Sequence, residues 1–243
     1  MKNKLWTFGC SFTESLKSMY EQDLKNGNPS SFIDYYKYMG NSFPPMWSEL
    51  LAEKLNLELE NKGVGGSSNY TILSSFIQNI KNFKENDLII IQWTISLRFR
   101  ICDYNTNKFR DLLPMNIDEP NMRKYFPYMQ NRERGIWFTE LIEYSHFIIE
   151  YCKSKNIKLM FWSVDDVLYS KLSNDIKDYF IHSPNGNNIE IGHDSYLSRK
   201  TNEWKIKQET NHTIDDEHYG KYGNHYMYEI LNINYNRLYN KIN

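Results

Sequence analysis

Four short, strongly apolar runs stand out along the chain, each bounded by polar residues. They are "LWTF" at 5–8, "LELEN" at 57–61, "LIIIQWT" at 88–94 and "IKLMFWS" at 157–163. Runs of this length are typical of strands buried in a parallel sheet. We therefore expect four parallel strands.

The segments between and after these runs have helical period. Apolar residues repeat at helical spacing in residues 44–55, 69–83, 135–156 and 223–242. The first of these segments opens on two prolines, which a first helical turn tolerates. Alternating strands and helices imply right-handed crossovers, so we expect a three-layer α/β/α fold with helices on both faces of a central parallel sheet.

Two regions interrupt this alternation. Residues 14–43 and 101–134 are rich in Tyr, Phe, Asn and Pro, and each follows the predicted carboxyl end of a strand. Loops at that edge bind ligands in open α/β sheets. The two regions either shape a substrate site or are surface excursions whose aromatic side chains pack on the domain.

Composition narrows the class of protein. With 243 residues, 40% of them hydrophobic, the chain fits a single domain over 1–243. Its formal net charge is -1, and acidic and basic residues are mixed along the chain. This distribution excludes a basic surface for nucleic acid. Cys10, Cys102 and Cys152 are few and far apart, so we expect neither disulfides, nor a metal site, nor a cofactor. No apolar run suits a signal peptide or a membrane span, and we expect a soluble cytoplasmic protein.

The first candidate for chemistry is "FGCSFT", at the end of the first strand. Gly9 permits a sharp turn, and Ser11 follows where backbone N–H groups point outward. A serine there can attack a carbonyl while its own N–H holds the oxyanion. Serine after a strand is also a common helix N-cap, and this motif alone leaves both interpretations open.

The second candidate is the loop "NKGVGGSSNY" after the second strand. Its glycines, Gly63, Gly65 and Gly66, allow backbone amides to approach a ligand, and Gly66 is the best placed to donate an oxyanion N–H. The loop lacks the Gly-Lys-Ser/Thr ending of a nucleotide-binding loop. The alternative is a tight turn capped by Ser67 or Ser68.

The third candidate is "TIDDEHYGKYGNH", just before the last predicted helix. Asp215 precedes His218 by three residues. A carboxylate beside a histidine fixes its tautomer and stabilises the imidazolium that forms when the ring takes a proton from serine. The alternative is an ordinary surface turn.

Taken together, the three motifs resemble the SGNH/GDSL hydrolases, and in particular the branch whose first motif reads Gly-Cys-Ser-Phe-Thr. The resemblance extends from residue 5 to about residue 230. It implies the flavodoxin-like form of the α/β/α fold. It also implies Ser11 as nucleophile, His218 as general base, Asp215 as the orienting carboxylate, and Ser11 and Gly66 as oxyanion donors.

The chain departs from the family pattern twice. Cys10 stands where many members have aspartate, and we expect it to be a buried packing residue. The family's Gly-x-Asn after the third strand is missing, so either Thr94 or Gln92 supplies the third oxyanion donor or that donor is absent. We assign Asn69, Gln92 and Arg98 to substrate binding, although Arg98 could instead pair with an acidic side chain. Losing one oxyanion donor costs roughly 100- to 1,000-fold in turnover, so slow catalysis fits this pattern.

The resemblance implies a serine esterase that works through an acyl-enzyme on a small-molecule or glycan ester. Aromatic insertions favour an acyl group carried by a carbohydrate, such as an O-acetyl group, because sugar rings stack on Tyr and Trp. Two alternatives remain: an acyltransferase with the same intermediate, and a catalytically impaired module that binds glycan or protein. The sequence does not fix an oligomeric state.

Overall fold

The computed structural model describes residues 2–27, 31–94, 98–103, 108–112, 134–163, 172–181 and 220–240. Its centre is a parallel sheet in the order β2-β1-β3-β6. The strands are β1 (Lys4–Phe8), β2 (Glu58–Asn61), β3 (Leu88–Trp93) and β6 (Lys158–Ser163). These are the four strands that the apolar runs predict, and their order is that of a flavodoxin-like sheet.

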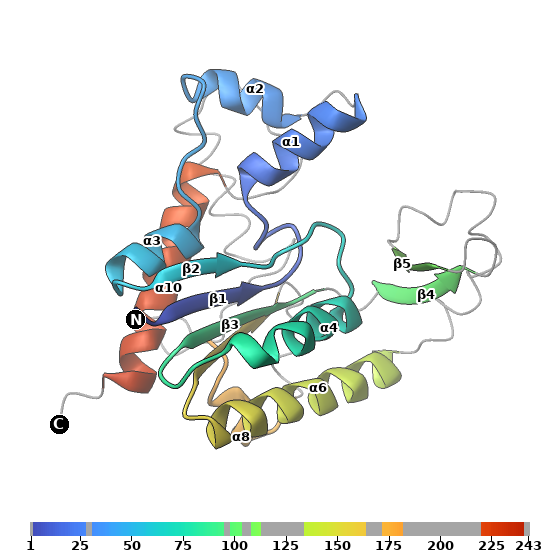
Figure 1. Ribbon diagram of the computed structural model, residues 1–243, viewed down its shortest axis with the longest axis vertical. Helices are drawn as coiled ribbons and strands as arrows, with labels where there is room; N and C mark the ends of the chain where they lie inside the picture. Colours follow the sequence, from blue (N-terminus) through green and yellow to red (C-terminus); the bar gives the residue numbers. More distant parts are fainter. Residues whose placement is uncertain are drawn as a thin grey trace.

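Helices cover both faces of this sheet. Helices α3 (Trp47–Lys54) and α10 (Lys221–Tyr239) lie on one face, and α4 (Asn69–Asn79) and α6 (Arg134–Ser154) lie on the other (Figure 1). A short 3-10 turn, η1 (Ile80–Asn82), follows α4, and α8 (Asn174–Lys177) packs beside α6. The predicted three-layer α/β/α fold is confirmed.

The core is divided by the sheet into two apolar clusters. Side chains alternate along each strand, so Leu88 and Ile90 pack toward α3 and α10 while Ile89 and Ile91 pack toward α4 and α6. All of β3 is buried, since it pairs with β1 on one side and β6 on the other. This rigid centre positions the loops at the carboxyl ends of the strands.

The region 14–43 contains two helices that the sequence did not predict. They are α1 (Leu16–Asn26) and α2 (Ser31–Tyr38), at the top of Figure 1. Ser15 caps α1 by accepting the N–H of Ser18 at 3.1 Å, and Gly27 ends it with a φ of 68°. Helix α1 begins at Leu16, five positions after Ser11.

The second unassigned region begins with a hairpin rather than a loop. Strands β4 (Phe99–Asp103) and β5 (Lys108–Leu112) pair antiparallel and lie beyond the end of the sheet, near α4 (Figure 1). Most of the remainder of 101–134, and all of the polar region 183–212, lie outside the described residues. Across the described helices, none has both the length and the apolar character needed to cross a membrane.

Candidate active site

The turn after β1 presents Ser11 at the carboxyl edge of the sheet. The carbonyl of Cys10 accepts the N–H groups of Thr13 and Glu14 at 2.9 and 3.0 Å, which closes a tight turn around Ser11. Ser11 is 8% exposed, and its hydroxyl has no hydrogen-bond partner within the described part of the chain. The turn therefore holds an uncommitted hydroxyl at the edge where α/β proteins bind ligands.

Gln92 supports this turn through hydrogen bonds. Its Oε1 accepts the N–H of Cys10 at 3.1 Å and the hydroxyl of Thr13 at 2.7 Å, and its Nε2 donates to the Cys10 sulfur at 2.8 Å. Gln92 and Cys10 are both fully buried. Cys10 is thus a packing residue, as the sequence predicts. Gln92 was expected to contact substrate, but it is buried and bonded to the turn around Ser11, which it supports.

The glycine loop closes against Ser11. Gly65 donates its N–H to Glu14 Oε2 at 2.5 Å, and a Cβ built on Gly65 would lie 3.8 Å from the Cβ of Ser11. Gly66 has a φ of 75°, which favours glycine. Among the described residues, the N–H groups of Ser11 and Gly66 have no acceptor. Two uncommitted backbone donors therefore belong to adjoining segments, as an oxyanion site requires.

Glu14 joins these two segments, and the sequence analysis missed it. The side chain is 3% exposed; besides Gly65 it accepts the hydroxyl of Ser18 at 2.7 Å and Nε2 of Gln22 at 3.3 Å. In the sequence Glu14 looks like any acidic residue before a helix. Its main partner is 51 positions away, so no local pattern marks it.

Asn69 and Thr94 form a second link at this edge. Asn69, the first residue of α4, accepts the N–H of Thr94 at 2.8 Å and donates to its carbonyl at 3.3 Å. The Thr94 hydroxyl is buried and has no partner in the described part of the structure. The Thr94 N–H is thus already used, and its hydroxyl is the group that remains for a ligand.

The start of α10 is linked to the turn around Ser11 through Trp47. The indole Nε1 of Trp47 donates to the carbonyl of Phe12 at 2.9 Å, and its backbone N–H donates to Asn224 Oδ1 at 3.1 Å. Asn224 in turn bonds the carbonyl of Gly220. His218 and Asp215 both lie outside the described residues, two and five positions before Gly220.

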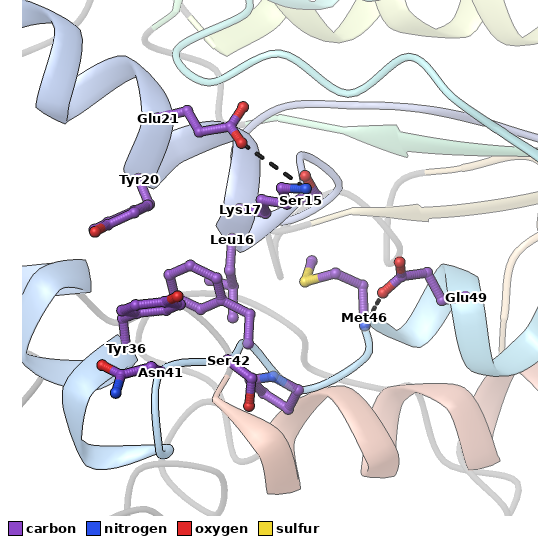
Figure 2. A pocket seen from close by; sticks show the side chains of 12 residues that line it. Ser15, Leu16, Lys17, Tyr20, Glu21, Tyr36, Asn41, Ser42, Met46 and Glu49 are labelled. Carbon is purple, nitrogen blue, oxygen red and sulfur yellow. Dashed lines mark hydrogen bonds and ion pairs between the residues drawn. The ribbon is translucent and has the colours of Figure 1, made fainter.

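Two cavities open near this edge. The first, of about 430 Å³, lies between α1, α2 and the start of α3 (Figure 2). Tyr20 and Tyr36 line it and stack with ring centroids 5.0 Å apart. The second, of about 320 Å³, lies between the start of α4, the β4–β5 hairpin and α6, and Arg98 and Asn69 line it. In the described ranges no group of three or more His, Cys, Asp or Glu side chains could hold a metal ion.

Comparisons with known proteins add little to this geometry. No protein-family model matches the chain, and no curated protein matches it either. Among solved structures, protein YxiM of Bacillus subtilis is similar with a TM-score of 0.44 and 12% identity over 98% of this chain and 57% of that one. A protein assigned to the lipolytic G-D-S-L family from Desulfitobacterium hafniense DCB-2 is similar with a TM-score of 0.36 and 13% identity, over 96% and 99%.

The chain thus spans little more than half the length of the YxiM chain. With TM-scores below 0.5, neither likeness carries an argument about chemistry.

Proposed function

We propose that the protein is a serine esterase or acyl hydrolase. Ser11 attacks the ester carbonyl, the N–H groups of Ser11 and Gly66 hold the oxyanion, and water then hydrolyses the acyl-enzyme. The observation that carries this proposal is that the Ser11 hydroxyl and the N–H groups of Ser11 and Gly66 have no partner among the described residues, on two segments that meet at Ser11 and Gly65. The buried, unpaired hydroxyl of Thr94 supports its assignment as a third donor in place of the family's asparagine.

His218 is proposed as the general base, with Asp215 orienting it. The network through Trp47 supports this assignment, because it fixes Asn224 and Gly220 close to the residue that follows Ser11. Only two positions separate His218 from Gly220. His218 is therefore two positions along the chain from a residue that hydrogen bonds link, through Asn224 and Trp47, to Phe12.

A carbohydrate-borne acyl group is the proposed substrate. Support comes from the first cavity, where Tyr20, Tyr36 and Phe43 stand beside amide, hydroxyl and carboxylate side chains (Figure 2). Aromatic faces and hydrogen-bonding groups in one hollow suit the apolar and polar faces of a sugar ring.

Hydrolysis of p-nitrophenyl acetate tests the activity. We expect a burst followed by slower turnover, because the aryl group leaves as the acyl-enzyme forms. Ser11→Ala should lower turnover by at least about a thousandfold and His218→Ala by a similar factor. Ser154→Ala, an exposed serine at the end of α6, is the matched control. Absence of turnover between about pH 6 and about pH 9 would instead favour a binding module.

An acyltransferase is the second candidate, because two separate cavities adjoin the same edge and could hold a donor and an acceptor. Mass spectrometry of products formed with a sugar alcohol present separates the two. Acylated sugar in excess over free acid would identify a transferase.

A further inference from the structure

The second cavity is lined by aromatic side chains, called here its aromatic wall, and by basic side chains. It lies between the start of α4, the hairpin and α6. Its aromatic lining residues are Tyr70, Phe99, Phe109, Trp137 and Tyr144. Arg98 and Arg100 line it as well, and Glu140 is the carboxylate among the described lining residues.

Arg100 already has partners. Its guanidinium carbon lies 5.5 Å from the ring centroid of Tyr70 and 5.7 Å from that of Phe109. Its Nε lies 3.5 Å from Asp111 Oδ1. Two aromatic faces and a carboxylate therefore compensate its charge.

Arg98 has no such partners. Its Nε and Nη1 atoms are buried, and neither has a hydrogen-bond partner among the described residues. Glu140 takes part in an interaction of its own, and it forms no ion pair with Arg98. Arginine stays protonated in proteins, and a buried charge without a counter-charge is unfavourable. Among the described lining residues, Arg98 therefore has no paired counter-charge.

A second unsatisfied donor lines the same cavity. Trp137 is 6% exposed, and its indole N–H has no partner in the described part of the chain. An indole N–H can only donate, so it also requires an acceptor. Two side chains that line this cavity, Arg98 and Trp137, thus carry N–H donors and cannot accept hydrogen bonds.

The cavity is linked to the turn around Ser11 through the glycine loop. Asn69 lines it and holds Thr94, while Gly65 of the same loop lies against Ser11. Asn69 is four positions after Gly65, so their Cα atoms lie within about 14 Å of each other. A ligand held in the cavity can therefore extend toward the turn around Ser11.

We propose that this cavity is an anion-binding subsite, in which Arg98 holds a carboxylate, sulfate or phosphate group and the aromatic wall holds the ring that carries it. The substrate class is then an ester that bears an anionic group. The proposal rests on the proposed function only in calling the ligand a substrate, because binding is measurable without turnover.

Calorimetric titration of the whole chain tests the binding. The probes are para-hydroxybenzoate, phenyl sulfate and phenyl phosphate, with para-hydroxybenzamide as the neutral match. We expect at least one anion to bind about tenfold more tightly than the amide, as a charge-assisted hydrogen bond allows. The rank of the three anions distinguishes the anionic groups. Equal binding of anions and amide would overturn the proposal.

Variants test whether Arg98 causes the preference for anionic probes over the neutral amide. Arg98→Gln should abolish it, Arg98→Lys should keep part of it, and Lys81→Gln, an exposed lysine of η1, should leave it unchanged. Arg98→Gln should also leave the melting temperature unchanged or higher, because it removes a charged group whose buried Nε and Nη1 have no hydrogen-bond partner among the described residues. A preference that survives Arg98→Gln, or that Lys81→Gln abolishes equally, would refute the assignment.

A kinetic arm separates this proposal from the proposed function. The substrates are para-acetoxybenzoate and para-acetoxybenzamide. Equal turnover of both esters would support the proposed esterase and contradict the anion-binding subsite. Charge-selective binding of the probes without turnover of either ester would support the anion-binding subsite and contradict the proposed esterase.

Discussion

Glu14 joins the two segments that carry the candidate oxyanion donors. Its carboxylate accepts the N–H of Gly65, and its own backbone belongs to the turn that presents Ser11. Asn61 strengthens the same contact, because its amide donates to the carbonyl of Thr13 at 2.7 Å and accepts the N–H of Gly63 at 2.9 Å. The separation between the Ser11 and Gly66 donors thus depends on two side chains outside the predicted triad.

Glu14→Gln should lower kcat about tenfold and leave KM nearly unchanged. The amide keeps the size of the side chain but loses the charge that strengthens the bond from Gly65. Steady-state kinetics on p-nitrophenyl acetate measure the effect. Glu53→Gln, at an exposed position of α3, is the control. A change confined to KM, or none at all, would contradict a positioning role for Glu14.

The three cysteines should differ in reactivity. Burial raises the pKa of the Cys152 thiol to about 12, which leaves roughly one thiolate in ten thousand near pH 8. Cys10 is also buried, whereas Cys102 is partly exposed. Iodoacetamide should therefore modify Cys102 first in the native protein, as followed by peptide mass spectrometry. Fast modification of Cys10 would contradict its role as a packing residue.

At the scale of elements, the β4–β5 hairpin is fastened to the start of α4 by Asp111. Its carboxylate accepts the N–H of Ser68 at 3.2 Å, the Ser68 hydroxyl at 2.8 Å and the Thr71 hydroxyl at 2.6 Å. Ser68 is the N-cap of α4, so the carboxylate also meets the positive end of the helix. The hairpin and α4 therefore form two walls of one cavity.

Asp111→Asn should lower the free energy of unfolding by about 1–2 kcal/mol, because the charge at the helix end and its charge-assisted bonds are lost. Urea denaturation measures the change. Asp178→Asn removes an exposed carboxylate and should have almost no effect. Equal stability of the two variants would show that the hairpin is not held through Asp111.

The elements that the sequence predicted are those whose cause is local. The apolar run of β3 and the helical period of residues 69–83 carry their own structural signal. The hairpin does not, because its strands are short and polar and depend on Asp111 contacting α4, some 40 positions earlier.

In the candidate site too, the sequence predicts some features and does not predict others. Ser11 and Gly66 were predictable, because a glycine turn and a serine leave a pattern in the sequence. The burial of Gln92 beneath Cys10 was not, because it depends on the register of β3 beside β1.

At the scale of the whole molecule, one sheet supports two apolar layers that share no side chains. Ile89 packs toward α4 and α6, and its neighbour Ile90 packs toward α3 and α10. Both are fully buried. The site at the carboxyl edge is therefore held from both faces.

Ile89→Ala and Ile90→Ala should each lower the free energy of unfolding by about 2–5 kcal/mol, since each opens a cavity in one layer. Ile233→Ala, where the side chain is 45% exposed, should cost far less. Thermal unfolding followed by circular dichroism checks this prediction. A large loss for only one of the two buried positions would mean that the sheet is covered on a single face.

Labelling with a fluorophosphonate probe tests the central claim, that Ser11 is an activated nucleophile, most directly. An activated serine forms a stable phosphonyl adduct, whereas ordinary serines do not. We predict one adduct per chain, located on Ser11 by peptide mass spectrometry, absent from Ser11→Ala and retained in Cys10→Ala. An adduct on another residue, labelling that survives Ser11→Ala, or no labelling of the wild-type chain would contradict the account.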